Sequence, residues 1–325
     1  MRENNVIVRG NLVYVNISGK WCVYDQSKEP LGSGAMGTVF YGYICESKTP
    51  VAIKKVKEVY SNDQNIRNRA RQEASLIFGH RNLVEMLGFC ESEYDNGPIF
   101  IVSKYVHGEN FDKFVQTKLG TLPHLHRIKT ICGMVMPIFD ALNYLHSNNI
   151  LHMDIKPSNI MVENGNNIRL MDLGIAYTDA YQMSNTSNMM GTPKYAAPEQ
   201  FGLKGTRETI DNRTDIYELS VTIYELLCNN NPFASQTFDE LIEKHKNLLL
   251  PYNKDIPKPI VEVLRKAAHP EKQQRYRNIV DFKNDFRKAT NELNEKKNVS
   301  YTRTILFFIL ISLLLLIIGL IIYLI

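Results

Sequence analysis

An uninterrupted apolar run closes the sequence and restricts what that part of the chain can become. It reads "ILFFILISLLLLIIGLIIYLI", from Ile305 to Ile325, and contains no charged residue. As an α-helix it would be about 31 Å long, which matches the hydrocarbon thickness of a bilayer. A helix buried in a globular core needs only an apolar stripe, whereas this run is apolar on every face. We therefore expect a transmembrane helix over 305–325 rather than a core helix.

Charged residues beside this run predict its orientation. Lys296, Lys297 and Arg303 precede it and no residue follows it. Because basic residues favour the cytoplasmic side of a membrane, we expect a C-terminal tail anchor with the rest of the chain in the cytosol. Residues 291–304 would form the juxtamembrane linker, and the bilayer would be a partner. The opening "MRENNVIVRG" has no long apolar run, so no signal peptide is expected.

Composition excludes two other classes of site. The net charge is +4, and no strongly basic cluster accompanies it, so we expect no nucleic-acid partner. The five cysteines are widely scattered, and no two of them have C-x-x-C spacing. We expect reduced thiols in a reducing compartment rather than a disulfide framework or a zinc site.

Hydrophobic periodicity divides the remaining chain into a β-rich part and a helical part. Alternation over the first 25 or so residues predicts a β-hairpin that turns near Gly19. Further strands are expected at 37–44, 49–56 and 98–106, with one helix over 61–80 between them. After about residue 108 the pattern is mostly helical, with long helices expected at 122–149 and 213–229. The fold class is therefore α+β.

The first candidate site is the stretch "LGSGAMGTVF", which contains Gly32, Gly34 and Gly37. Glycines let a backbone close over phosphate groups because no Cβ intervenes. Dinucleotide-binding folds share the G-x-G-x-x-G spacing, but in them a helix follows the glycines. Here β-branched and aromatic residues follow, which favours a hairpin lid. An ordinary glycine-rich turn is the alternative.

The second candidate is Lys54, in the apolar strand "VAIKK". A buried ammonium group needs a counter-charge, which phosphate oxygens and a carboxylate would supply. Glu73 is the best candidate, because it lies on the apolar face of the expected 61–80 helix, four residues before Ile77. A solvated lysine at a strand end is the alternative, and Lys55 fits that description better.

Acidic and amide side chains supply the remaining chemistry. In "ILHMDIKPSNIMV", Asp154 can orient a hydroxyl nucleophile and accept its proton, and Lys156 can reach a migrating phosphoryl group. Asn159 can offer an amide oxygen to Mg²⁺. In "LMDLGIAY", Asp172 precedes Gly174 and can hold the same cation, although a turn aspartate is the alternative. The segment "GTPKYAAPEQ", residues 191–200, closes a stretch rich in hydroxyl groups.

In this order, these motifs resemble those of the protein kinase family, over roughly residues 24–290. The resemblance implies a bilobal fold with ATP in the cleft between the lobes. Residues 1–23 would form an N-terminal β extension, 24–104 the N-lobe and 105–290 the C-lobe. The implied cofactors are ATP and Mg²⁺, with Mn²⁺ as a substitute.

The resemblance also assigns roles to single residues. The phosphate-covering loop would comprise Gly32, Ser33, Gly34, Ala35, Met36 and Gly37. The adenine pocket would be formed by Val39, Ala52, Tyr105, Val106 and Met161. The catalytic residues would be Lys54, paired with Glu73, and Asp154, the base, beside Lys156. The metal ligands would be Asn159 and Asp172. Glu199 is expected to pair with Arg275, and Asp215 to brace the catalytic loop.

Lys156 and the "GTPKYAAPE" segment are similar to the serine/threonine branch, most of all to membrane-bound bacterial enzymes of the eukaryotic type. Protein substrates with Ser or Thr are implied, and a homodimer is a further partner that the resemblance allows. A membrane-anchored pseudokinase or scaffold is the alternative function. A small-molecule phosphotransferase is a third, but it gives no reason to keep the A-P-E segment.

This chain departs from the family pattern at Leu173, Ser220 and Met153. In much of the family an Arg precedes the catalytic Asp and receives a phosphate from the activation loop. Methionine carries no charge, so Met153 spares the chemistry but removes that regulatory contact. We expect activity that does not depend strongly on one phosphate in residues 177–192.

Overall fold

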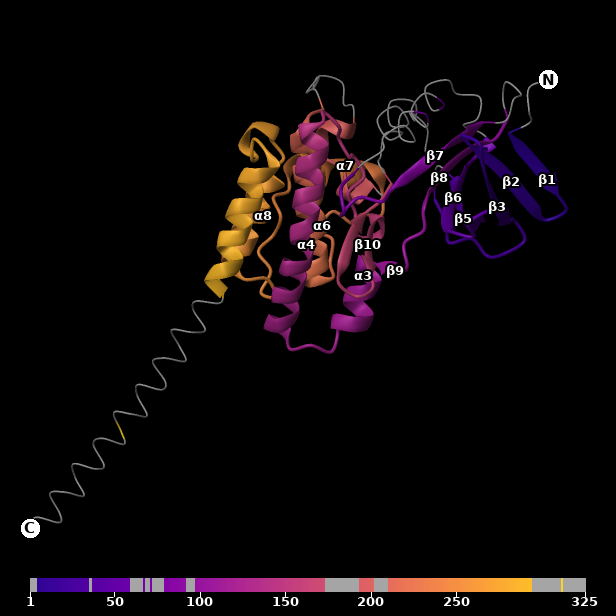
Figure 1. Cartoon of the computed structure of the whole chain (residues 1–325). Coiled ribbons are helices and arrows are strands. Elements are labelled where there is room, and N and C mark those ends of the chain that lie inside the picture. The colour runs from indigo at the N-terminus through magenta and orange to yellow at the C-terminus, as the bar shows by residue number, and fades with distance from the viewer. Residues whose placement is uncertain are drawn as a thin grey trace, which may run out of the picture.

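The chain folds into two lobes that lie side by side (Figure 1). The computed structural model describes residues 5–34, 37–58, 67, 71, 79–91, 97–172, 193–201, 210–293 and 311. A smaller lobe of strands, indigo to purple in Figure 1, precedes a larger and mostly helical lobe, magenta to yellow. The chain passes between them just after Lys104. This arrangement confirms the predicted α+β, bilobal fold.

The strands of the small lobe form one antiparallel sheet in the order β1-β2-β3-β5-β6-β8-β7, with β4 paired to β5. Their bounds are β1 Val6–Arg9, β2 Leu12–Ile17, β3 Lys20–Asp25, β4 Gly32–Ser33, β5 Gly37–Ile44, β6 Pro50–Val56, β7 Met86–Glu91 and β8 Ile99–Lys104. The predicted hairpin near Gly19 joins β2 to β3, and Gly19 has a φ of +87°. The glycine-rich stretch forms the β4–β5 hairpin expected from the residues after it.

The N-terminal strands also close one face of the small lobe. Val13, Val15 and Ile17 alternate along β2 and are all buried. The side chain of Ile17 lies against Gly88 of β7, so closely that a Cβ at Gly88 would come within 2.3 Å of it. The Cys90 thiol donates a hydrogen bond to the carbonyl of Asn5. Strand β2 therefore contributes Val13, Val15 and Ile17 to the small-lobe core.

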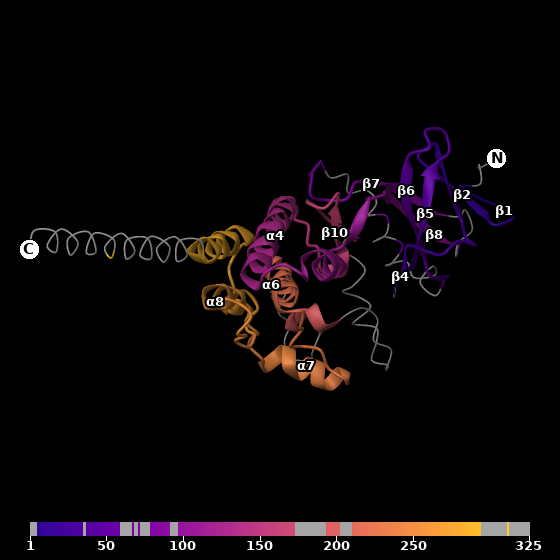
Figure 2. The same cartoon turned by 90° about the horizontal axis from the view of Figure 1, so that it is seen from below.

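The large lobe is built around helix α6. Its described helices are α3 Phe111–Phe114, a π-helical turn Val115–Leu119, α4 His124–Ser147, α6 Asn212–Cys228, α7 Phe238–Asn247, α8 Lys258–Ala267 and the helical residues 279–293. The long predicted helices correspond to α4 and α6. Helix α6 begins where the Asp211 side chain accepts the Arg213 N–H, and it packs against α4 and α8 (Figure 2). Because most of its side chains are buried, it is a rigid support for the loops around it.

A second, smaller sheet lies where the sequence predicted mostly helix. It contains β9 Gly108–Asn110, β10 Ile160–Glu163 and β11 Asn167–Leu170, in the order β11-β10-β9. The segment before β7 contacts its edge: Leu170 N–H donates to the Asn82 carbonyl, and Val84 N–H to the Leu170 carbonyl. These bonds hold the end of β11, and hence the residues that follow it, against the small lobe.

Several sequence expectations fall outside the residues that the structure describes. They include Ala35, Met36, Glu73, most of the expected 61–80 helix, and the apolar 305–325 run apart from Ile311. Among the helices that are described, none has both the length and the apolar character needed to cross a bilayer.

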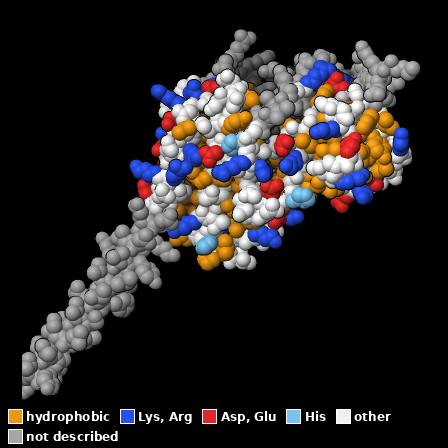
Figure 3. Space-filling model, in the orientation of Figure 1, with side chains coloured by type: hydrophobic (Ala, Val, Ile, Leu, Met, Phe, Trp, Pro, Cys, Tyr) orange, Lys and Arg blue, Asp and Glu red, His pale blue; other side chains and the backbone are white. Residues whose placement is uncertain are grey.

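On the visible face of the large lobe, basic and acidic side chains are interspersed (Figure 3).

Candidate active site

A cavity of about 420 Å³ opens between the two lobes. Its walls come from the glycine hairpin and β6 on one side, and from β9, β10 and the end of β11 on the other. Every residue that the sequence assigned to the adenine pocket lines it, namely Val39, Ala52, Tyr105, Val106 and Met161. Within the described chain the Val106 N–H donates to no other residue, so a ligand edge can take it. Their contact with adenine stays a prediction.

One end of this cavity carries charge from both lobes. Lys54 Nζ of β6 lies 3.8 Å from Asp172 Oδ1, just after β11. The Asp172 side chain is 44% exposed, so its carboxylate can also reach a ligand. Of the predicted glycine loop, Gly32 lines the cavity, and Gly34 N–H bonds the Gly37 carbonyl at 2.9 Å. The predicted partner Glu73 lies outside the described residues.

Next to this end, the side chains of the "DIKPSN" loop converge on Asp154. Lys156 Nζ donates to both carboxylate oxygens, at 2.9 and 2.7 Å. Asn159 Nδ2 donates to Asp154 Oδ2 at 2.8 Å and to the Asp154 carbonyl at 2.9 Å. Because both of these oxygens act as acceptors, the amide nitrogen of Asn159 must face Asp154. The amide oxygen of Asn159 is therefore free to bind a hard cation.

The buried helix α6 holds this loop from below, as predicted for Asp215. Asp215 Oδ2 accepts the His152 N–H at 2.9 Å, and Oδ1 accepts the Met153 N–H at 2.8 Å. Met153 has a φ of +63°, a left-handed conformation that costs a non-glycine residue about 1–2 kcal/mol. The two hydrogen bonds from Asp215 offset that cost, and they fix the loop immediately before Asp154.

Two further α6 residues hold the loop and were missed in the sequence. Glu218 Oε2 accepts the Ile155 N–H at 2.8 Å, and Thr222 Oγ1 donates to the Ile155 carbonyl at 2.9 Å. Positions 215, 218 and 222 share one face of a helix. Polar residues at that spacing in an otherwise apolar helix are the signal that could have revealed them.

His152 connects the loop to the segment that carries Asp172. Its Nε2 lies 2.9 Å from the Met171 carbonyl, which can only accept, so Nε2 carries the proton. Nδ1 then accepts the Asp154 N–H at 3.4 Å. Burial lowers the pKa of His152, which keeps the ring neutral. His152 therefore joins the backbone just before Asp172 to the loop that carries Asp154.

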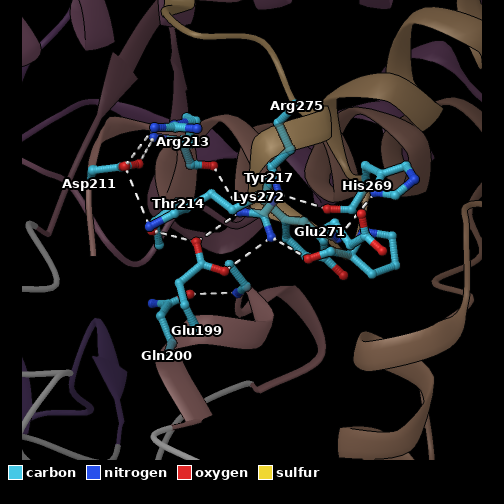
Figure 4. Close-up of polar contacts among 12 residues, drawn as sticks. Glu199, Gln200, Asp211, Arg213, Thr214, Tyr217, His269, Glu271, Lys272 and Arg275 are labelled. Atoms are coloured by element: carbon cyan, nitrogen blue, oxygen red, sulfur yellow. Dashed lines mark hydrogen bonds and ion pairs between the residues drawn. The ribbon is translucent and has the colours of Figure 1, made fainter. Parts of the chain in front are cut away.

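The segment 193–201 is tied to the large lobe by a buried ion pair (Figure 4). Arg275 donates to the two carboxylate oxygens of Glu199 at 2.8 and 3.0 Å, which confirms the predicted pair. Thr214 adds a third bond to Glu199 at 2.7 Å. Burial raises the pKa of Glu199, but the charge of Arg275 and the hydrogen bonds from Arg275 and Thr214 together lower it. The segment is thus fixed beside the catalytic loop.

Comparison with known proteins agrees with this geometry. The sequence model of the family described as "Protein kinase domain" matches residues 25–285. The chain is 28% identical to the serine/threonine-protein kinase PrkC of Bacillus subtilis (strain 168) over 295 residues, covering 88% of this chain and 43% of PrkC. It is 31% identical to the serine/threonine-protein kinase PknB of Mycobacterium leprae (strain TN) over 212 residues, covering 64% of this chain and 33% of PknB. The chain thus spans less than half the length of these relatives.

A solved structure shares the fold. The kinase domain of Mycobacterium tuberculosis PknI superposes with a TM-score of 0.61 at 21% identity, covering 89% of this chain and all of that domain. This likeness concerns the architecture alone, whereas the family match spans both lobes and every catalytic motif that the structure describes. The chain therefore belongs to the protein kinase family.

Proposed function

We propose that this chain is a serine/threonine protein kinase that transfers the γ-phosphoryl group of ATP to hydroxyl groups of proteins. The observation that carries the proposal is that Lys54 and Asp172 line one end of the interlobe cavity, while Asp154 and Asn159 lie in the loop next to it. Lys54 and Asp172 meet there across the two lobes, and Asp154 and Asn159 are joined by hydrogen bonds beside them. The Met171 N–H donates to the main-chain carbonyl of Asn159 at 2.8 Å, which ties the segment before Asp172 to the loop that carries Asp154.

The residues present fit ATP and a divalent cation. Apolar side chains of both lobes can enclose an adenine ring, and the Lys54 ammonium can contact phosphate oxygens. The amide oxygen of Asn159 and the carboxylate of Asp172 are oxygen donors of the kind that Mg²⁺ prefers, and Mn²⁺ is an alternative. When bound, the cation neutralises charge on the phosphates.

Asp154 is placed to handle the proton of the substrate hydroxyl. Its carboxylate is 21% exposed and is oriented by Lys156 and Asn159, so it can accept a hydrogen bond from an incoming hydroxyl. As the hydroxyl oxygen bonds to the γ-phosphorus, the bond from that phosphorus to the β–γ bridging oxygen breaks. The hydroxyl proton passes to Asp154 and ADP leaves.

The choice of serine/threonine proteins as substrates rests on sequence and on relatives. Lys156 and the "GTPKYAAPE" segment match the serine/threonine branch, and PrkC and PknB are both serine/threonine-protein kinases. We also infer that the 305–325 run anchors the kinase to the lipid bilayer, with the catalytic lobes on the cytosolic side. We favour this function over a pseudokinase or scaffold because the chain retains Lys54, Asp154, Asn159 and Asp172.

The test is transfer of labelled phosphate from Mg-ATP to a generic basic protein by the detergent-solubilised full chain. Asp154→Asn keeps the shape of the side chain but cannot accept the proton, and we expect it to lower the rate about 10²–10⁴-fold. Ser220→Ala is the matched control. Ser220 lies on another face of α6, where its hydroxyl donates a hydrogen bond to the Leu264 carbonyl of α8. Equal rates for the wild-type protein and Asp154→Asn would exclude the proposed activity.

A further inference from the structure

The peptide unit between Asp154 and Ile155 is held from both ends. Its N–H donates to the buried carboxyl group of Glu218 at 2.8 Å. Its carbonyl accepts the Asn159 amide at 2.9 Å, and the same amide nitrogen bonds Asp154 Oδ2. Rotation of this one peptide would therefore displace both the proposed base and the proposed metal ligand.

Glu218 also belongs to a buried link between the loop and the 193–201 segment. The Gln200 side chain is close enough to Glu218 to lower the pKa of its carboxyl group, and Gln200 Nε2 lies 3.4 Å from the Met153 carbonyl. Gln200 Oε1 accepts the Ala197 N–H at 2.5 Å. The Gln200 side chain thus joins the backbone of the loop, at the Met153 carbonyl, to the backbone of the 193–201 segment, at the Ala197 N–H.

We propose that Glu218 is a positioning residue for phosphotransfer, which fixes the Asp154–Ile155 peptide and, through Gln200, holds the catalytic loop against residues 193–201. The proposal rests on the proposed kinase function and deepens it. Asp215 accepts the N–H groups of His152 and Met153, and among the described residues no hydrogen bond joins it to this peptide. Without Glu218, the Ile155 N–H would be a buried donor with no acceptor, which costs more than the hydrogen bond itself contributes.

The surroundings of Glu218 favour its neutral form. Burial and the nearby charge of Asp215 raise the pKa of Glu218 well above its usual value, and the charge of Asp154 acts in the same direction. The Ile155 N–H, which bonds the carboxyl group, and the nearby Gln200 amide oppose this and lower the pKa. A neutral carboxyl group and a carboxamide have nearly the same size, and both offer an acceptor oxygen. We therefore expect glutamine at position 218 to support the loop as glutamate does. Methionine would fill the space but offers no acceptor oxygen.

The test compares Glu218→Gln and Glu218→Met in the full chain, with Ser220→Ala as the control for loss of a buried polar group on α6. Since a lost buried hydrogen bond is worth 1–3 kcal/mol, we expect Glu218→Met to lower kcat about tenfold or more, with the KM for ATP changed less than about twofold. Its Mg²⁺ requirement should also rise, because the Asn159 amide is no longer aligned. Glu218→Gln should stay within about threefold of wild type and Ser220→Ala within about twofold.

Three results would overturn the proposal: wild-type kcat in Glu218→Met, equal losses in Glu218→Met and Ser220→Ala, or equal losses in the methionine and glutamine variants. An inactive wild-type protein would instead count against the kinase function itself. Thermal unfolding confirms that each variant is folded. If Glu218→Met does not fold, Gln200→Met cuts the other arm of the link and should show the same loss of kcat.

Discussion

Two adjacent lysines on β6 show how one residue position decides a role. Lys54 lines the cavity and faces Asp172, whereas Lys55 pairs across the sheet with Thr38 and Phe100 and does not line it. We expect Lys54→Met to lower kcat/KM for ATP about 10²-fold or more, because a charge contact to the phosphates is lost in a partly buried site. Lys55→Met is the matched control and should stay within about threefold. Similar losses in both would show that strand stability, not phosphate contact, is affected.

The residue before Asp154 carries a second prediction. Met153 is 9% exposed and cannot pair with a phosphate, while Gln200 and Asp215 hold its backbone. Complete dephosphorylation by a phosphatase, verified by mass spectrometry, should therefore change the initial rate by less than about threefold, since no charge-assisted contact is removed at this position. Abolition of activity by the phosphatase would contradict the prediction.

Glu218 makes stability depend on pH in a definite direction. Its pKa is raised above the ordinary 4.5, so above about pH 4.5 the unfolded chain has released a proton that the folded chain keeps. Stability of the wild-type protein then falls with rising pH, by about 1.4 kcal/mol per pH unit at most for one proton, until the folded-state pKa is reached. Glu218→Gln has no carboxyl proton at this position and therefore lacks this pH dependence. Its unfolding free energy relative to wild type should increase between about pH 5 and about pH 7 in urea titrations, and a constant difference would be inconsistent with a neutral Glu218.

At the scale of elements, the contact between β2 and β7 decides how the small lobe is closed. Gly88 has a φ of +147°, and an added Cβ would come 2.3 Å from Ile17. We expect Gly88→Ala to destabilise the protein by about 2–4 kcal/mol, through backbone strain plus overpacking. Gly10→Ala is the control, because Gly10 also has a positive φ, +59°, but has no atom within 4 Å of the added Cβ.

Chemical denaturation of the two alanine variants measures the difference. Gly10→Ala should lose only the backbone term of about 1–2 kcal/mol. A double variant with Ile17→Ala should lose less than the sum of the single changes, because the smaller side chain removes the clash. Strict additivity would show that Ile17 and Gly88 do not interact.

Local pattern predicted most elements but not their distant contacts. The hairpin at Gly19, the strands at β5, β6 and β8, and helices α4 and α6 each follow from alternation or helical spacing over short windows. The packing of β2 on β7 depends on Gly88, a single glycine whose partner lies about 70 residues away, and no window contains both. The small β9–β11 sheet was missed because its strands are only three or four residues long and because β9 lies far along the chain from the β10–β11 hairpin.

The residues of the site likewise divide into those that the sequence predicted and those that it missed. Asp154, Asn159, Asp172 and Lys54 were found because their chemistry depends on residue type at fixed spacing. Glu218 was missed because its role depends on which buried segment it faces, whereas its spacing from Asp215 shows only that the two residues share one face of the helix. A sequence shows that a glutamate is present, but only the packed structure shows that the catalytic loop covers it.

For the whole molecule, the apolar 305–325 run predicts where the kinase works. Deletion of residues 305–325 should move the protein from the membrane fraction to the soluble fraction, because 18 of these residues are Leu, Ile or Phe and favour hydrocarbon over water. The two lobes contain the site, so specific activity towards a soluble protein should change less than about twofold. Replacing the run with another apolar sequence of equal length should restore membrane binding. Retention of the deleted form on membranes would contradict the anchor.

Closure of the small lobe by β2 and β7 also has a consequence for synthesis of the protein. Residues 12–17 of β2 are synthesised before residues 86–91 of β7. Because ribosomes add roughly 5–20 residues per second, the interval between the two strands is roughly 3–15 s. During that interval Val13, Val15 and Ile17 have no cover from β7. A chaperone or a neighbouring nascent chain can reach this strand during that interval, before β7 covers it.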